Sequence, residues 1–84
     1  MSGYYYNHYY QDLDEAIEQA RKQASPFSAY YTIVYFDPVE RAYFTATDYE
    51  LIWPEYVHPD RLSWLQERLQ RSREVWSSDD KPLF

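Results

Sequence analysis

The side chains best suited to catalysis or metal binding are few in this sequence of 84 residues. His8 and His58 are its two histidines, and it has no cysteine. Zinc sites and activated nucleophiles are commonly built from these residue types, so neither chemistry has a signature here. The acidic run at 12–15 (Asp-Leu-Asp-Glu) lacks the third ligand and the glycine of a calcium-binding loop. Gly3 is the only glycine, which excludes the glycine-rich loops that hold nucleotide phosphates.

His58 is the one histidine with carboxylates nearby in the sequence, but its position suits another role. It lies between Val57 and Pro59, where it is placed to precede or cap a helix that begins at the proline. A serine nucleophile would need a base and an orienting acid around a strained turn, and no such motif is present. We therefore expect a protein that is not an enzyme and that has no cofactor and no metal.

Charge is the strongest functional signal in the composition. The chain carries 14 acidic against 8 basic residues, a formal net charge of -6. Nucleic-acid affinity comes largely from Lys and Arg, so direct binding of DNA or RNA is disfavoured, whereas a basic protein surface is a suitable partner. The acids are concentrated between residues 37 and 55, where Arg41 is the only base. The residues that we predict to contact a partner are Asp37, Glu40, Tyr43, Asp48, Tyr49, Glu50 and Glu55.

A β-hairpin is the element that the sequence predicts most clearly. Two runs rich in β-branched and aromatic residues, 29–36 and 42–47, flank the loop DPVER at 37–41. Asp37 and Pro38 suit the first two positions of a type I turn. In the second run, alternation predicts that Phe44 faces the core, while Tyr43, Thr45 and Thr47 lie on an open face of the sheet. The first run is apolar on both faces, so its buried face stays undetermined.

Two helices are predicted on either side of the hairpin. The first covers residues 12–24, where the apolar spacing gives a stripe with three alanines. The second covers residues 59–76, with Pro59 at its first position and Leu62, Leu65, Leu69 and Trp76 on its stripe. Pro54 and Pro59 bracket a segment that we interpret as an ordered loop, with Leu51 and Ile52 as an optional short strand. The polar residues 77–84 predict a flexible tail after a single domain at 1–76.

The predicted fold is α+β with two layers. An antiparallel sheet of three to four strands has both helices on one face, in the order β-α-β-β-(β)-α. Residues 4–10 hold five tyrosines and form either the first strand or a flexible aromatic arm. No apolar run is long enough for a membrane span or a signal peptide, so we expect a cytoplasmic protein without membrane contact.

Two resemblances follow from these features. The expected element order is similar to that of RNA-recognition domains, and the stretch 41–46 resembles their third-strand motif but lacks its glycine and basic surroundings. In size, charge and lack of catalytic motifs the chain resembles phage-encoded anti-CRISPR and other anti-defence inhibitors. This resemblance implies a protein that occludes a basic surface, such as one that binds nucleic acid, on a larger protein complex. We expect the chain itself to be a monomer or a weak homodimer. The alternative is an accessory or homodimeric module that uses a Tyr/Trp-rich apolar face with Trp64 and Val75.

Overall fold

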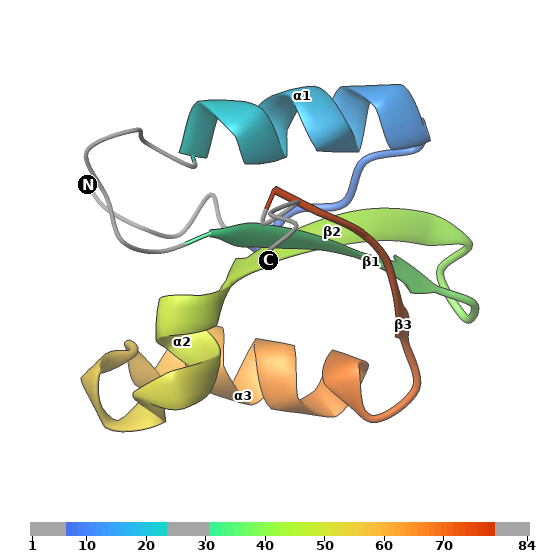
Figure 1. Cartoon of the computed structure of the whole chain (residues 1–84). Helices are drawn as coiled ribbons and strands as arrows, with labels where there is room; N and C mark the ends of the chain where they lie inside the picture. The colour runs from blue at the N-terminus through green and yellow to red at the C-terminus, as the bar shows by residue number, and fades with distance from the viewer. Residues whose placement is uncertain (1–6, 24–30, 79–84) are drawn as a thin grey trace.

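The protein folds into one open antiparallel sheet with helices packed against it (Figure 1). The computed structural model describes residues 7–23 and 31–78. The predicted α+β class and the antiparallel sheet of at least three strands are confirmed. The elements follow in the order α1 (Leu13–Gln23), β1 (Thr32–Asp37), β2 (Ala42–Thr47), α2 (Asp48–Ile52), the 3-10 helix η2 (Pro54–Tyr56), α3 (Pro59–Leu69) and β3 (Arg73–Ser77).

The hairpin forms where the sequence predicts it. Strands β1 and β2 pair along their full length, from Thr32 opposite Thr47 to Asp37 opposite Ala42. The Asp37 carboxylate accepts a hydrogen bond from the backbone N–H of Val39 at 3.0 Å, which closes the turn locally. Residues 29 and 30 of the predicted first strand lie outside the described residues.

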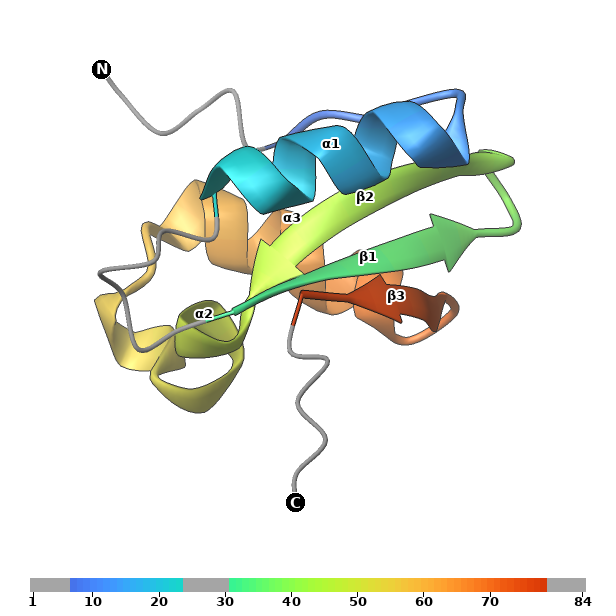
Figure 2. The ribbon, with the colours of Figure 1, turned by 45° about the horizontal axis from the view of Figure 1, so that its top comes forward.

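The prediction that the second helix extends to residue 76 is wrong, because its last residues form a strand instead. Helix α3 ends at Leu69, and β3 pairs antiparallel with β1, giving the strand order β2-β1-β3 (Figure 2). After Leu69 the next helical turn would offer only Gln70, Arg71 and Ser72, so it has no apolar side chain to bury. The Val75-Trp76 pair that follows favours a strand.

The ordered part of the chain also passes the predicted boundary at residue 76. The Ser78 backbone N–H donates to the Thr32 carbonyl, and the Thr32 N–H donates to Ser78 Oγ, both at 2.9 Å. Ser77 is therefore the last residue of β3, and Ser78 is hydrogen-bonded to the first residue of β1. Residues 79–84 of the predicted tail lie outside the described residues.

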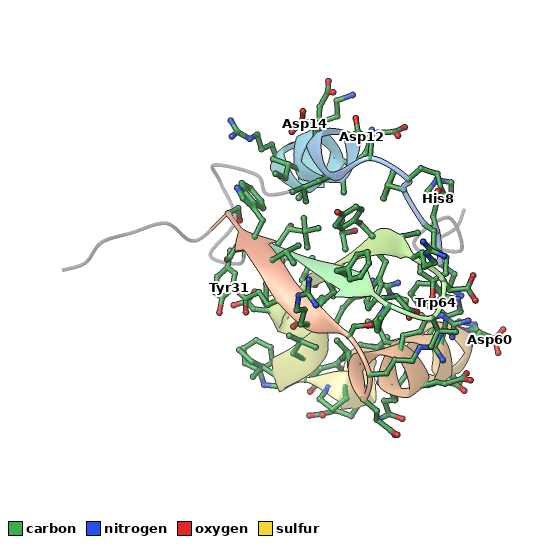
Figure 3. All side chains as sticks on the ribbon, turned by 90° about the vertical axis from the view of Figure 1, so that its right-hand side faces the viewer. His8, Asp12, Asp14, Tyr31, Asp60 and Trp64 are labelled. Carbon is green, nitrogen blue, oxygen red and sulfur yellow. The ribbon has the colours of Figure 1, made fainter. Side chains whose placement is uncertain are left out.

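The helices lie on opposite faces of the sheet, which differs from the expected placement of both on one face. Helix α1 covers one face, and α2 and α3 cover the other (Figures 1 and 3). Fully buried Ala16 and Ala20 bring α1 close to Val34 of β1. On the other face Leu65 of α3 packs against Phe44 and Ala46 of β2. The two apolar faces of the hairpin are thus both used as core.

This arrangement corrects the expectation of an open sheet face. Tyr43 is half-buried in the layer beneath α1, and Thr45 is buried. Phe44 faces the core as predicted, but it does so on the α3 side. The aromatic side chains of this sheet are therefore largely interior groups.

The N-terminal segment meets the outer edge of β2 at one point. Tyr10 and Tyr43 exchange two backbone hydrogen bonds, of 2.7 and 2.8 Å, in an isolated bridge. Tyr10 packs in the α1 layer, whereas Tyr9 packs against Phe44 and Trp64 in the α3 layer. Successive side chains of an extended chain point to opposite faces, which explains this split. Residues 4–6 of the predicted strand or arm lie outside the described residues.

None of the helices in residues 7–23 and 31–78 has the length and apolar character needed to cross a membrane.

Candidate functional site

The segment after β2, interpreted from sequence as a loop, is helical. Thr47 caps α2: its Oγ1 accepts from the Glu50 N–H at 3.3 Å, while Glu50 Oε1 accepts from the Thr47 N–H at 3.0 Å. This is the reciprocal capping box, in which two backbone donors at the start of a helix are satisfied. The loop interpretation is therefore wrong. The spacing Thr-x-x-Glu at residues 47–50, which indicates the start of a helix, is present in the sequence.

Glu50 also ties α2 to α3 through Arg61. The guanidinium of Arg61 donates to Glu50 through Nε at 2.8 Å and through Nη2 at 3.0 Å, and Nη2 donates to the Thr45 carbonyl at 2.9 Å. Arg61 is buried, and its guanidinium lies 5.5 Å from the centre of the Trp64 ring. The charge of Glu50 is thus neutralised within the fold.

Asp48 is turned inward as well. Its Oδ1 accepts from the Tyr31 N–H at 3.1 Å, and its own N–H donates to the Tyr31 carbonyl at 3.0 Å. The side chain is buried. Asp48 therefore joins the start of α2 to the start of β1 and offers little to an external partner.

A group of exposed apolar side chains follows directly. We call the segment 51–56 the α2–η2 corner; it lies at the opposite end of the sheet from the hairpin turn (Figure 1). Its large apolar residues remain exposed, namely Leu51 at 37%, Ile52 at 56%, Trp53 at 36% and Tyr56 at 70%. Half-buried Tyr49 supports the corner, with its ring centre 5.4 Å from that of Trp53. Outside the corner, Val39 and Val75 are the other exposed large apolar residues of the described chain.

The charges around this corner are acidic. The sequence has no Lys or Arg between residues 42 and 60, and Glu55 and Asp60 are exposed. Asp60 lies on the outer side of α3 (Figure 3), where His58 caps the helix by accepting the Asp60 N–H through Nδ1 at 3.1 Å. The corner thus combines exposed apolar side chains with exposed carboxylates.

At the other end of the sheet, Asp37 is fully buried in a polar network. Arg71 donates to both of its carboxylate oxygens, at 2.9 and 2.8 Å, and the Tyr9 hydroxyl donates to Oδ2 at 2.6 Å. These bonds, chiefly those of the Arg71 guanidinium, hold the pKa of Asp37 well below its ordinary value. Tyr9 also accepts from Arg68 Nε at 2.7 Å. Asp37 therefore joins the hairpin turn to the end of α3.

The structure does not gather the predicted contact residues into one site. Asp37 and Glu40 lie at the hairpin turn, and of these only Glu40 is exposed. Asp48 and Glu50 are used inside the fold near the corner, where Glu55 is exposed. Tyr43 is part of the α1 layer. Sequence reasoning missed the exposed apolar residues of the corner, although a Leu-Ile-Trp run next to Pro54 in a supposed loop was a usable signal.

Metal binding has no structural counterpart in the described ranges. No group of three or more His, Cys, Asp or Glu side chains within residues 7–23 and 31–78 is arranged to hold a metal ion.

No family model, curated protein or solved structure matches this chain. The functional interpretation therefore rests on the molecule's own surface.

Proposed function

We propose that the protein is a non-catalytic binding protein that occludes a basic surface of a larger protein or nucleoprotein complex in the cytoplasm. The observation that supports this function is the α2–η2 corner, where exposed apolar side chains adjoin the exposed acids Glu55 and Asp60 in a stretch, residues 42–60, that contains no Lys or Arg. Contiguous exposed apolar surface marks interaction sites, and the surrounding acids favour a partner of opposite charge.

The distribution of charge over the described surface supports the same proposal. Arg61 and Arg71 are engaged with Glu50 and Asp37, whereas many carboxylates face solvent. The exposed acids of the described chain are Asp12, Asp14, Glu15, Glu18, Glu40, Glu55, Asp60, Glu67 and Glu74, and the exposed bases are Arg21, Lys22, Arg41 and Arg73. Such a surface accelerates encounter with a basic partner and repels nucleic acid.

The fold gives a second argument against direct nucleic-acid binding. Proteins that bind single-stranded RNA on a sheet stack the bases on exposed aromatic residues. Here helices cover both sheet faces (Figure 1), and Tyr35 and Phe44 stack on each other inside the α3 layer. In this proposal the protein acts as acidic anti-defence inhibitors do, by covering a surface that its partner needs.

Affinity capture with matched charge variants tests the function. The chain is immobilised, proteins from the cells that encode it are loaded, and bound proteins are eluted with increasing salt. We expect a basic protein to be retained, and its own binding to nucleic acid to fall when the free chain is added. The double variant Glu55→Gln/Asp60→Asn should elute at lower salt.

The control variant Asp14→Asn/Glu18→Gln makes the same charge change on α1. Asp14 lies on the far side of the molecule from Asp60 (Figure 3). It should elute close to the wild-type chain. Retention of acidic proteins only, or equal weakening by both variants, would contradict binding through the corner's charge.

A homodimeric accessory module is the second candidate, and the same exposed apolar residues favour it. Of the two residues expected on its apolar face, Val75 is exposed, whereas Trp64 is half-buried against Phe44 and Tyr9. Sedimentation equilibrium at low and high salt separates the candidates. A dimer that persists at high salt supports the module, whereas a monomer throughout supports the acidic binder.

A further inference from the structure

We infer that the α2–η2 corner is the docking element of the protein, and that its partner presents an apolar pocket rimmed by Lys or Arg side chains. This inference rests on the proposed function and adds to it the contact residues and the chemistry of the partner. Apolar anchors, rather than carboxylates, then supply most of the affinity.

The concentration of apolar exposure at one place is the first support. Four large apolar side chains are exposed within residues 51–56, against Val39 and Val75 in the rest of the described chain. Tyr and Trp are enriched among the residues that dominate binding energy at protein interfaces. Ile52 and Tyr56 are the most exposed members of the corner, so they are the anchors that a pocket on a partner would enclose.

The corner is also held in place before any partner arrives. The capping box of Thr47 and Glu50 fixes the start of α2, and the bidentate bond from Arg61 fixes Glu50 against α3. Asp48 adds a link to β1 through Tyr31. A preorganised element loses less conformational entropy on binding, which strengthens association without further contacts. The inward-facing acids of this region thus support the surface that the outward-facing residues form.

Charge selects the partner among the possible occupants of this corner. A second copy related by two-fold symmetry would place the same patch on itself and bring Glu55 and Asp60 of both copies together. The stretch that carries both acids, residues 42–60, contains no Lys or Arg. Nucleic acid and anionic lipid are disfavoured by the same repulsion. A protein surface with cations around an apolar pocket satisfies both features of the corner.

Designed peptides provide the test, with the full chain labelled for NMR. The probe is a synthetic amphipathic helix of Leu and Lys; its controls are the Leu and Glu version and a Ser and Lys peptide of equal length. We expect the Leu and Lys peptide to shift the backbone amide signals of residues 51–53 and 55–57 and the Trp53 indole signal, Pro54 having no amide N–H. The acidic peptide should shift none of them, and the Ser and Lys peptide should bind more weakly than the probe.

Variants then separate the apolar from the charged contribution. Ile52→Ser/Tyr56→Ser should weaken probe binding by at least about tenfold, because it removes both anchors. The unfolding midpoint should stay near the wild-type value, because both side chains are mostly exposed. Glu55→Gln/Asp60→Asn should weaken binding less and flatten its dependence on salt.

The outcomes distinguish this inference from the function on which it rests. Signal changes centred on Asp14 and Glu18, with the corner unaffected, would overturn the docking inference and leave an acidic binding protein. Concentration-dependent changes at the corner without peptide would overturn it in favour of self-association. Absence of any binding by the Leu and Lys probe at low salt would also overturn the inference, whereas the proposed function fails only if capture retains no basic protein.

Discussion

At the residue scale, Asp37 shows how a surface acid of the sequence becomes a structural group. It is fully buried, and it accepts hydrogen bonds from Arg71, from Tyr9 and from two backbone N–H groups of its own turn. Replacing one partner of a buried ion pair leaves the other charge uncompensated. The Arg71 side chain remains 30% exposed, so part of this cost is relieved by water.

We therefore predict that Asp37→Asn lowers the free energy of unfolding by about 3 kcal/mol, at the lower end for such pairs. Urea denaturation at neutral pH measures this value. The control Glu40→Gln removes an exposed acid from the same turn and should change stability by no more than about 0.5 kcal/mol. Equal effects of the two variants would show that burial of Asp37 is energetically unimportant.

The Asp37 carboxylate should also make the stability of the fold depend on pH in the acid range. The pKa of Asp37 is lower in the folded state than in the unfolded state. Its contribution to the free energy of unfolding is therefore fully present above the unfolded-state pKa of about 3.9 and is lost as the pH falls toward the folded-state pKa. The stability difference between the wild type and Asp37→Asn should thus be constant near neutrality and shrink below about pH 4. Urea denaturation at a series of pH values checks this. A difference that stays constant into strong acid would contradict the linkage.

Arg41 carries local backbone strain. Its φ of 55° lies in the left-handed region, which costs about 1 to 3 kcal/mol for a residue with a Cβ. Arg41→Gly relieves that strain, but glycine also increases the conformational entropy of the unfolded chain. We therefore predict that the free energy of unfolding of Arg41→Gly exceeds that of Arg41→Ala by about 1 kcal/mol. Alanine is the matched control because it also removes the guanidinium. Thermal and urea unfolding compare the pair, and a more stable alanine variant would exclude strain at this position.

The contact residues could be predicted from the sequence only in part, for a physical reason. Composition identifies acids, but whether a carboxylate is free depends on cations that the fold brings near it. Arg61 pairs with Glu50 across 11 residues, and Arg71 pairs with Asp37 across 34. Within residues 7–23 and 31–78, Glu40 and Glu55 form no such ion pair, and both remain exposed.

At the element scale, helix α2 depends on its first residues because it has only five. A helix of this length cannot form by intrinsic propensity alone. We predict that Thr47→Ala, which removes the acceptor for the Glu50 N–H, lowers the free energy of unfolding by about 1 kcal/mol. Amide exchange at Glu50 and Leu51 should speed up more than exchange in α1.

Thr47→Ser retains the hydroxyl and is the control for this variant. It should keep both the stability and the slow exchange of α2. If serine and alanine behave alike, the loss comes from the methyl group of Thr47 rather than from the cap.

Elements with local signals could be predicted, and those fixed by distant contacts could not. The hairpin and the helix starting near Asp12 follow from alternation, turn residues and apolar spacing. The residues of β3 also fit a continuation of helix α3, because Trp76 falls on the apolar stripe that Leu62, Leu65 and Leu69 begin. Its conformation is decided by the edge of β1, where Trp76 pairs opposite Val34 and joins the α1 layer.

At the scale of the whole molecule, a three-stranded sheet between two helical layers gives several tyrosines a place in the core. Layering was not predictable, because β1 is apolar on both faces and alternation alone does not say which helix covers which face. Tyr10 lies in the α1 layer, and Tyr9 and Tyr35 lie in the α3 layer. The Tyr9 hydroxyl is hydrogen-bonded to Asp37 and Arg68, while its ring packs against Phe44 and Trp64 in the core.

These three tyrosines predict instability in alkali. Burial raises the pKa of Tyr9, Tyr10 and Tyr35 in the folded state. Their contribution to the free energy of unfolding is fully present below the unfolded-state pKa of about 10 and is lost as the pH rises through the folded-state pKa values. Urea denaturation should therefore show falling stability above about pH 10.

Part of the rise in tyrosinate absorbance should accompany the loss of helical circular dichroism, because Tyr9, Tyr10 and Tyr35 ionise less readily in the folded chain than in the unfolded chain. Tyr35→Phe removes one of the ionising groups and should make the alkaline loss shallower. Complete ionisation of all tyrosines in a chain that keeps its helical signal would contradict this prediction.

The ion pair between Asp37 and Arg71 also determines when the chain can fold during its synthesis on the ribosome. Asp37 is synthesised 34 residues before Arg71, and β1 is made well before β3, its second neighbour in the sheet. A nascent chain that has exposed only the hairpin would have to bury a carboxylate without its cation. We therefore expect the hairpin to emerge early but to remain open to solvent, and the finished core to close only after α3 and β3 have left the exit tunnel.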